Sequence, residues 1–303
     1  MKVIFHQAAL GDFALILPLL RGLEQPASVV CPWSRGRLAA GLIEGLGAVD
    51  IELFEFTRLH APGGPSTLSP AVAELFEQAE AVISFVAEPG GSWAENVKKL
   101  TPKAELIFLP TRPTGPSAHD RRGQPRHVTE VHAQLLRERG IELSAEPVAV
   151  KGDPAGPWVV HPGSGGRDKC WPAERMAELV DRLRDDGREV RVVYGEAEAQ
   201  RWTDAQRARW VEGYGAQGCG SLAQLTERLA GAAGFLGNDA GPTQLAAQLG
   251  LPTVALFGPS DPRVWAPRGP AVTVIAPETP RGMAWLEVER VAEAVRSAAG
   301  PGR

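Results

Sequence analysis

Apolar and polar positions along the chain predict strands and helices in alternation. Short continuous apolar runs are typical of parallel strands buried on both faces, and longer runs with apolar residues three and four positions apart are typical of helices. In the first half of the chain, strands are predicted over residues 2–5, 27–31, 51–56, 81–85 and 105–109. The helices predicted between and after these strands cover residues 13–23, 35–46, 71–78 and 127–139.

The pattern stops at residues 144–157, which contain three prolines and two glycines, and then restarts. The second half predicts strands over residues 158–161, 190–194, 234–237, 253–257 and 272–275. Its predicted helices cover residues 172–186, 196–210, 221–233, 243–249 and 288–298. Strands that alternate with helices on both sides of a linker predict an α/β protein with two Rossmann-like domains. We place these domains at residues 1–150 and 151–303. An alternative for the final helix is that it packs on the first domain.

Composition excludes several classes of protein. The 303 residues are 44% apolar and 22% charged, which is typical of a soluble globular protein. A net charge of −4 argues against wholesale nucleic-acid binding. The three cysteines fit neither a disulfide framework nor a zinc site and favour a reducing cytoplasm. No apolar run reaches the roughly 20 residues that span a bilayer, no signal peptide is predicted, and the dispersed histidines predict no metal site.

Ligands of open α/β sheets bind at the carboxyl ends of the strands, so the loops there are the candidates for chemistry, in a cleft between the two domains. The first such loop contains Gly11 and Asp12. Gly11 allows a ligand to approach the backbone closely. Spacing alone favours Asp12 as an N-cap of the following helix, with a general base as the alternative.

The loop of residues 161–172, HPGSGGRDKCWP, follows a strand and opens a helix. Its glycines and Ser164 expose groups that can hold phosphate oxygens, and Lys169 adds positive charge at a helix N-terminus. These features predict a diphosphate site, with a solvated surface loop as the alternative.

Two more strand-to-helix loops carry polar candidates. In the loop of residues 237–244, the backbone N–H groups of Gly241, Thr243 and Gln244 can point at an anion, and Thr243 adds a hydroxyl. Asp239 either accepts hydrogen bonds from sugar hydroxyls or braces its own loop. In the loop that begins at residue 194, Glu196 and Glu198 can hold ribose hydroxyls or complement the helix dipole.

Together these loops resemble glycosyltransferase family 9, the ADP-heptose:lipopolysaccharide heptosyltransferases. The segment GDFALILPLL resembles the family's G-D-x-x-x-x-x-P, HPGSGGRDKCWP resembles its H-P-G…K-x-W-P, and GNDAGPTQLAAQLGLPTVALFGPSDP is similar to its D-[ST]-G-x-x-H-x-A-A-A-L-G-x-P…L-F-G. The three segments occur in the family's order and extend from residue 4 to about residue 270.

The resemblance implies a GT-B fold and metal-independent, inverting transfer without a cofactor, from a nucleotide-sugar donor bound by the C-terminal domain. It implies Asp12 as the general base and Lys169 as the residue that stabilises the leaving diphosphate. It implies that Ser164, Gly241 and Thr243 complete the phosphate site and that Glu198, or less directly Glu196, holds the ribose. The implied donor is ADP-linked, and the implied acceptor is a glycolipid or glycan at the cytoplasmic face of a membrane, with peripheral membrane contact and no nucleic acid.

This chain departs from the family at two positions, with Gln244 in place of the usual His and Ala240 in place of Ser or Thr. These changes motivate an alternative in which the chain binds nucleotide sugars without transferring them. A second alternative is a GT-B epimerase, for which His6, Glu88 and Asp239 are the acid/base candidates.

Acceptor contacts are expected from the N-terminal loops at residues 57–70, 87–103 and 110–126. The basic side chains in these loops can meet an anionic acceptor or lipid headgroups; they are Arg58, Lys98, Lys99, Arg112, Arg121 and Arg122.

Overall fold

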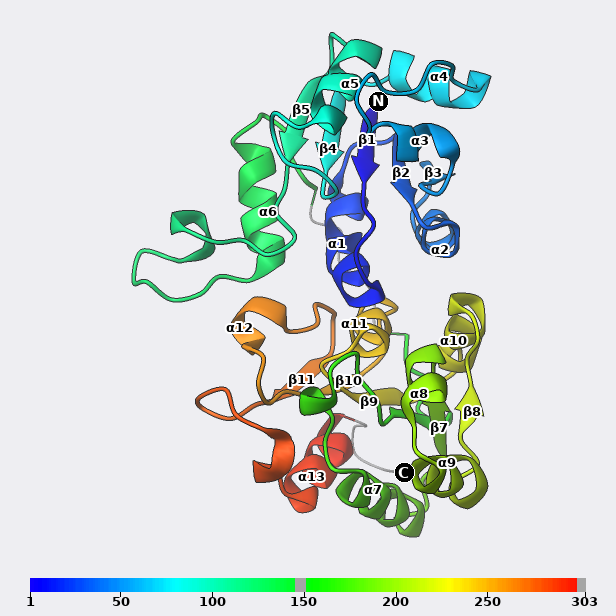
Figure 1. Ribbon diagram of the computed structural model, residues 1–303. Helices are drawn as coiled ribbons and strands as arrows, with labels where there is room; N and C mark the ends of the chain where they lie inside the picture. Colours follow the sequence, from blue (N-terminus) through cyan, green and yellow to red (C-terminus); the bar gives the residue numbers. More distant parts are fainter. Residues whose placement is uncertain (145–150, 299–303) are drawn as a thin grey trace. The chain divides into compact units, whose positions relative to one another are not determined.

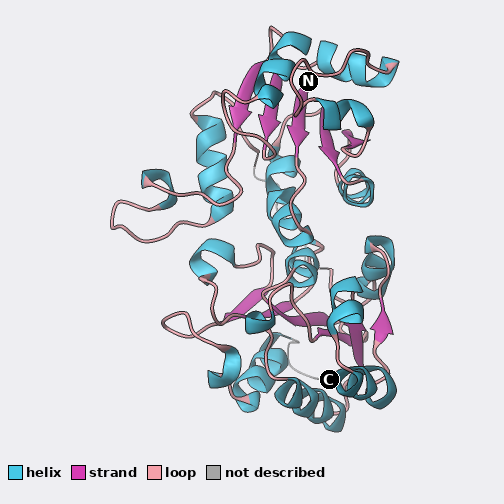
Figure 2. Ribbon diagram, in the orientation of Figure 1, coloured by secondary structure: helices cyan, strands magenta, loops and turns pink. Residues whose placement is uncertain are grey.

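The structure is a computed structural model that describes residues 1–144 and 151–298. The chain divides into two compact units, Met1–Glu146 and Pro147–Arg303. Residues 145–150 of the predicted linker (144–157), which include residue 150 at the predicted domain boundary, lie outside the described residues. In each unit, helices cover both faces of a parallel sheet (Figure 2), as the continuous apolar strands predicted.

The first unit has a five-stranded sheet in the order β3-β2-β1-β4-β5 (Figure 1). Its strands are β1 (Lys2–Phe5), β2 (Ala27–Cys31), β3 (Leu46–Asp50), β4 (Ala81–Ser84) and β5 (Glu105–Phe108). Its α-helices are α1 (Leu10–Gly22), α2 (Trp33–Leu42), α3 (Phe54–Arg58), α4 (Pro70–Glu77), α5 (Ser92–Leu100) and α6 (Val128–Arg137), and Pro116–Ala118 form a 3-10 turn.

Successive residues of β1 point to opposite faces of this sheet. Ile4 packs in a core with α1, α2 and α6, whereas Phe5 packs in a second core against Phe56 of α3, Phe76 of α4 and Trp93 of α5. This double burial explains why the strands are apolar throughout.

The predicted strand at residues 51–56 is wrong. The third strand is Leu46–Asp50, which pairs with β2 in a register that places Asp50 opposite Cys31. Helix α2 ends at Leu42, and Gly45 takes a left-handed conformation with φ 79°, so the chain turns early and the next five residues enter the sheet. Residues 54–58 then form α3 rather than a strand.

The second unit has a six-stranded sheet in the order β11-β10-β9-β6-β7-β8. Its strands are β6 (Trp158–His161), β7 (Val190–Tyr194), β8 (Gln217–Gly218), β9 (Gly234–Asn238), β10 (Thr253–Leu256) and β11 (Val272–Ile275). Its α-helices are α7 (Ala173–Asp185), α8 (Glu196–Arg201), α9 (Asp204–Arg207), α10 (Leu222–Leu229), α11 (Gly241–Gln248), α12 (Pro262–Trp265) and α13 (Val288–Ala298). Arg167–Lys169 and Met283–Trp285 form 3-10 turns, and Ala208–Gly213 form a π-helix.

The final helix α13 packs against α7 and the strands β10 and β11 of its own unit. One other helix of this unit differs from the prediction. The single helix predicted at residues 196–210 is broken after Arg201, because Thr203 caps a new helix by accepting a hydrogen bond from the Gln206 backbone N–H. Within the described residues, no helix is long and apolar enough to cross a bilayer.

Candidate functional site

Asp12 and Gly11 lie in the first turn of α1, directly after β1. The interpretation of Asp12 as an N-cap is wrong, because the N-cap position is occupied by Ala9, whose side chain makes no capping hydrogen bond. Asp12 instead lies in the first turn of α1, where the helix dipole favours negative charge. The sequence predicted that this helix begins at residue 13, whereas it begins three residues earlier, at Leu10.

His6 follows β1 and is almost completely buried, with its ring packed edge-on against Phe13 and Phe85. Burial, with the positive charge of Arg35 and the nearby His132, lowers the pKa of His6 from 6.5 to about 3. His6 is therefore neutral near pH 7 and lacks the titration that an epimerase acid or base needs.

In the second unit, Lys169 and Asp239 meet at the carboxyl ends of two adjacent strands. β6 pairs with β9, so the loop after His161 lies beside the loop after Asn238. The Lys169 Nζ atom lies 2.6 Å from Asp239 Oδ2, and the Ser260 hydroxyl donates to the same oxygen at 2.6 Å. The Ser164 hydroxyl donates to the Asp239 carbonyl oxygen at 2.8 Å. Asp239 was predicted either to bind sugar hydroxyls or to brace its own loop. It braces loops, but it does so through bonds with the side chains of Lys169, Ser260 and Ser164, which belong to other loops.

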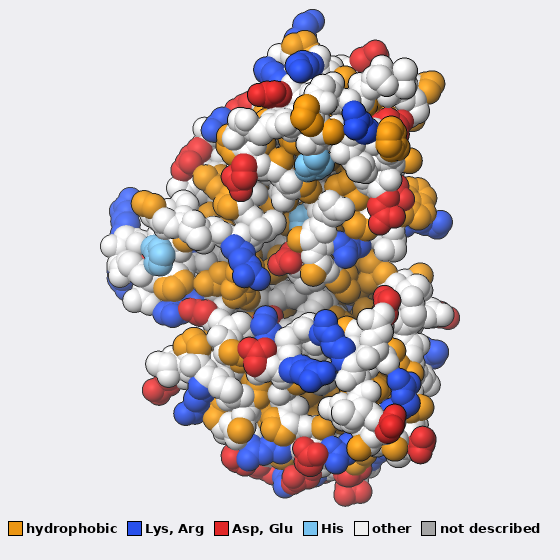
Figure 3. Space-filling view, viewed as in Figure 1, with side chains coloured by type: hydrophobic (Ala, Val, Ile, Leu, Met, Phe, Trp, Pro, Cys, Tyr) orange, Lys and Arg blue, Asp and Glu red, His pale blue; other side chains and the backbone are white. Residues whose placement is uncertain are grey.

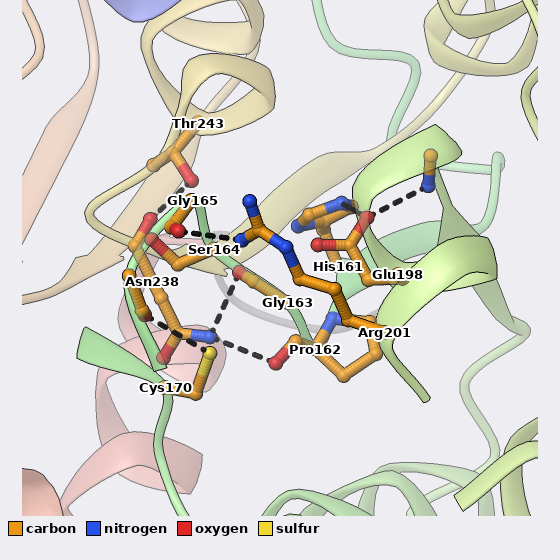
Figure 4. A network of polar contacts seen from close by, with 12 residues as sticks. His161, Pro162, Gly163, Ser164, Gly165, Cys170, Glu198, Arg201, Asn238 and Thr243 are labelled. Carbon is orange, nitrogen blue, oxygen red and sulfur yellow. Dashed lines mark hydrogen bonds and ion pairs between the residues drawn. The ribbon is translucent and has the colours of Figure 1, made fainter. Parts of the chain in front are cut away.

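Asn238 holds the loop of residues 161–172 in place, and sequence reasoning missed it. Its side-chain amide donates to the carbonyl oxygens of Pro162 and Gly163 at 3.0 and 3.1 Å, and its Oδ1 atom accepts from the Trp171 backbone N–H at 2.9 Å. Figure 4 shows the Asn238 side chain directed at Pro162 and Gly163. The signal in the sequence was an asparagine at the end of an otherwise apolar strand. Its side-chain amide is fully buried, and a buried amide requires hydrogen-bond partners.

The start of α11 keeps part of its predicted role. Ala240 occupies the N-cap without a side-chain capping bond, and Gly241 begins the helix. The Thr243 hydroxyl is not available to a phosphate as predicted, because it is buried and donates to the Asn238 carbonyl oxygen at 2.6 Å. The prediction that the Gln244 backbone N–H points at an anion is also wrong, because that group donates to the Ala240 carbonyl oxygen.

The Gln244 side chain has a structural contact. Its Nε2 atom donates to the Trp265 carbonyl oxygen at 2.7 Å, and the side chain is buried. The amide thus joins α11 to the end of α12 (Pro262–Trp265).

Glu198 is buried at the start of α8 and contacts both neighbouring strand ends. Its Oε2 atom accepts from the Gly195 backbone N–H at 2.9 Å and lies 3.4 Å from His161 Nε2. Burial acts to raise the pKa of Glu198, but the hydrogen bonds from His161 and Gly195 and the charge of His161 lower it overall. The carboxylate therefore stays ionised. Glu196 is exposed and accepts a hydrogen bond from Gln200, away from these contacts.

A pocket of about 470 Å³ lies between the loop of residues 161–172 and the helices α8 and α9. Ser164 and Glu198 contribute to its wall, and the Arg201 guanidinium reaches across to donate to the Gly165 carbonyl oxygen at 2.6 Å (Figure 4). Three tryptophans line it, one of them Trp210 of the π-helix, a conformation that is frequent at functional sites. The lining residues are Pro162, Gly163, Ser164, Arg167, Cys170, Trp171, Pro172, Ala173, Ala197, Glu198, Arg201, Trp202, Thr203, Gln206 and Trp210.

Positive charge accompanies this pocket. Arg167 and Arg201 are both exposed, and neither forms an ion pair with a described residue. Figure 3 shows basic side chains on the visible surface of the second unit. Within residues 1–144 and 151–298, no three His, Cys, Asp or Glu side chains gather as ligands of a metal ion would.

Comparison with known proteins gives the family and the fold. The model of glycosyltransferase family 9 (heptosyltransferase) matches residues 133–288. Lipopolysaccharide heptosyltransferase 1 of Pseudomonas aeruginosa is 36% identical over 111 residues, which cover 36% of this chain and 31% of that relative. The match thus spans about a third of the length of the curated relative.

Solved structures match over nearly the whole chain. The E. coli heptosyltransferase WaaC with ADP is 18% identical with a TM-score of 0.66, over 98% of this chain and 100% of that one. A family 9 glycosyltransferase from Veillonella parvula is 19% identical with a TM-score of 0.67, over 98% and 96% of the two chains. E. coli ADP-heptose lipopolysaccharide heptosyltransferase II is 19% identical with a TM-score of 0.63, over 99% and 98%. The fold of these proteins is the GT-B arrangement that the sequence predicted.

Proposed function

The chain belongs to glycosyltransferase family 9, and from that premise we propose that it transfers a heptose-like sugar from an ADP-linked donor to a glycolipid of the lipopolysaccharide type. The matched relative is named for lipopolysaccharide, and one matched solved structure contains ADP. The observation that carries the proposal is the convergence of Lys169, Ser164 and the start of α11 at adjacent strand ends in the second unit.

The donor diphosphate occupies this convergence. Its oxygens accept hydrogen bonds from the Lys169 ammonium and from the backbone N–H groups at Gly241 and Thr243, where the helix dipole favours negative charge. Asp239 lies beside them and is directed to the sugar hydroxyls. Ser164 supports the site by its bond to the Asp239 carbonyl oxygen.

The nucleoside of the donor occupies the neighbouring pocket. A volume of about 470 Å³ suits a ligand of this size, and Trp202, the partly exposed tryptophan of its wall, offers a stacking surface to a base. Glu198, held ionised in the pocket wall by His161 and Gly195, accepts from the ribose hydroxyls.

In the transfer step, the acceptor hydroxyl oxygen attacks the anomeric carbon and gives its proton to the Asp12 carboxylate. The bond between the anomeric carbon and the phosphate oxygen breaks, and ADP leaves with the electron pair. Lys169 stabilises the charge that develops on the leaving diphosphate. The attack occurs opposite the leaving group, so the anomeric configuration inverts, and the step uses neither a metal ion nor a cofactor.

The acceptor is bound by the first unit, with Arg58, Lys98, Lys99, Arg112, Arg121 and Arg122 as contacts to its anionic groups or to lipid headgroups. A lipid-anchored acceptor requires the enzyme to work at a membrane surface, which we place at the cytoplasmic face. Replacing Arg121 and Arg122 by Glu is expected to reduce binding to vesicles that contain anionic lipids, and unchanged binding would remove this part of the proposal.

Turnover tests the function directly. The assay measures ADP release from ADP-heptose in the presence of a heptose-free lipopolysaccharide core. Asp12→Asn is expected to reduce kcat by about 10²–10⁴-fold and to leave ADP affinity unchanged, while Glu44→Gln, an exposed carboxylate in the same unit, retains activity. If the protein binds ADP but releases none from ADP-heptose with any acceptor, the alternative of a binding protein is favoured. If ADP is released in the absence of acceptor and at the same rate in Asp12→Asn, the assignment of Asp12 as the base is contradicted.

A further inference from the structure

A second pocket of the second unit, with a volume of about 200 Å³, lies at the carboxyl ends of β10 and β11. Its wall comes from residues 258–263, which follow β10, and from residues 277–280, which follow β11. Three prolines give the apolar part of this wall. The polar side chains of the wall are those of Ser260, Asp261, Arg263 and Glu278. A concave site in which a few polar groups stand among apolar ones is typical of small-molecule binding.

Contacts between and within the two loops hold this pocket in shape. The Arg281 backbone N–H donates to the Gly258 carbonyl oxygen at 3.0 Å, which joins one loop to the other. Gly258 packs so closely on Met283 that a Cβ atom at position 258 would lie 2.3 Å from the Met283 sulfur. Asp261 and Arg263 form an ion pair at 2.7 Å. The pocket is therefore formed by the protein alone, as ligand sites usually are.

Ser260 connects the second pocket to the proposed diphosphate site. Its hydroxyl donates to Asp239 Oδ2 at 2.6 Å, and the Lys169 Nζ atom lies 2.6 Å from the same oxygen. A single carboxylate oxygen thus lies between the ammonium that we assign to the diphosphate and the wall of the second pocket. A sugar bonded to that diphosphate begins beside this wall.

The order of the strands places three parts of the unit in a row. The sheet runs β11-β10-β9-β6-β7. The second pocket lies beyond β10 and β11, the ion pair of Lys169 and Asp239 lies beyond β6 and β9, and the nucleoside pocket lies beyond β6 and β7. Figure 1 shows α12 on the β11 side of this unit and α8 on the β7 side. A nucleotide sugar has its sugar, diphosphate and nucleoside in the same order.

Glu278 lies at the end of this row. It follows β11, the edge strand of the sheet, so among the strand-end loops it is far from Lys169. Its side chain is exposed, and it forms no ion pair within residues 1–144 and 151–298. A carboxylate only accepts hydrogen bonds, so a hydroxyl group is a suitable partner. The part of a bound sugar that reaches Glu278 is the part farthest from the anomeric carbon.

We propose that the second pocket binds the sugar of the donor and that Glu278 accepts hydrogen bonds from the hydroxyl groups on the exocyclic carbons of a heptose. Ser260 and Asp239 meet hydroxyl groups nearer to the anomeric carbon. This inference rests on the proposed function, because it takes the diphosphate to lie at Lys169. It deepens that function by naming a residue that selects the donor sugar, and Glu278 lies outside the segments that resemble the family.

Calorimetric titration with three ligands tests this assignment: ADP, ADP-heptose and an ADP-linked pentopyranose, which has no exocyclic carbon. Glu278→Ala is expected to weaken ADP-heptose binding by about tenfold or more, because hydrogen bonds to a charged group are lost. Binding of ADP and of the ADP-pentose is expected to stay within about twofold of wild type. Glu227→Ala removes an exposed carboxylate from α10 of the same unit and is expected to bind all three ligands as wild type does.

Equal ADP-heptose affinity in wild type and Glu278→Ala would overturn the proposal. Equal weakening of all three ligands would also overturn it, because Glu278 would then act on the nucleotide or on the fold. Equal weakening of the two ADP-sugars, with ADP unchanged, would contradict the contact to the exocyclic hydroxyl groups. If the wild-type protein binds no ADP, the proposed function fails and this inference fails with it, whereas normal ADP binding with any of the other contrary results refutes this inference alone.

Discussion

The ammonium group of Lys169 lies 2.6 Å from the Asp239 carboxylate, although the two residues are 70 positions apart in the sequence. The carboxylate is largely buried and the lysine about one-third exposed. This ion pair holds the Lys169 side chain, from the loop of residues 161–172, against the loop of residues 237–244. The same pairing partly neutralises the positive charge that a diphosphate would otherwise meet, so the donor and Asp239 compete for Lys169.

This competition predicts that Asp239→Asn strengthens ADP binding. Removing a carboxylate beside the diphosphate removes a repulsion and frees the ammonium, and an effect of about 1 kcal/mol gives roughly fivefold tighter binding. Isothermal titration of ADP measures the change. ADP-heptose is expected to gain less, because Asp239 is assigned to the sugar hydroxyls. Tenfold weaker ADP binding would instead mean that Asp239 acts mainly by positioning Lys169.

Gln244 is predicted to support stability and not donor binding. Gln244→Ala leaves the Trp265 carbonyl oxygen without its buried donor, which costs about 1–3 kcal/mol of unfolding free energy. Chemical denaturation checks the loss, and ADP affinity is expected to remain within about twofold of wild type. Gln200→Ala, which removes an exposed hydrogen bond to Glu196, is the control and is expected to change neither quantity. A large loss of ADP affinity in a stable Gln244→Ala protein would show a direct donor contact.

His6 is predicted to make the protein sensitive to acid. Its pKa in the folded chain is about 3, below the value of about 6.5 in an unfolded chain. Above pH 6.5 both states are neutral and His6 contributes nothing. Between about pH 6 and pH 4 the unfolded chain binds a proton that the folded chain refuses, so the unfolding free energy falls by up to about 1.4 kcal/mol per pH unit.

Replacing His6 by Leu is therefore expected to flatten the fall of stability between about pH 6 and pH 4. The readout is the slope from denaturation at several pH values, and it is independent of any constant packing cost of the substitution. The exposed His60, replaced by Ala, is expected to leave the slope unchanged. An equal slope in wild type and His6→Leu would show that His6 protonates in the folded state.

Much of the fold could be predicted from the sequence because parallel strands buried on both faces are continuous apolar runs. Residues 2–5, 27–31 and 158–161 were assigned without error for this reason. The third strand was missed because the turn at Gly45 is decided by a left-handed backbone conformation, and the alternation at residues 51–56 resembles a strand equally well.

The candidate site could be predicted only in part. The loops were found because parallel strands place their carboxyl ends at one edge. The sequence does not show which polar groups of these loops remain free to bind a ligand, because that depends on the order of the strands in the sheet. The pairing of β6 with β9 brings Ser164 and Lys169 to Asp239. The sequence does not reveal that the Thr243 hydroxyl bonds the Asn238 carbonyl oxygen or that the Gln244 backbone N–H bonds the Ala240 carbonyl oxygen, because these bonds form only in the folded chain.

The central claim is that the second unit binds the donor diphosphate through Lys169, and calorimetric titration with ADP tests it most directly. Lys169→Ala is compared with wild type and with Lys151→Ala, an exposed lysine of the same unit. Loss of a charged hydrogen bond to phosphate is worth about 1.5–3 kcal/mol, so Lys169→Ala is predicted to weaken ADP binding by about 10–150-fold. Lys151→Ala is predicted to bind as wild type does. Equal ADP affinity in wild type and Lys169→Ala, or no ADP binding to the wild-type protein, would contradict the account.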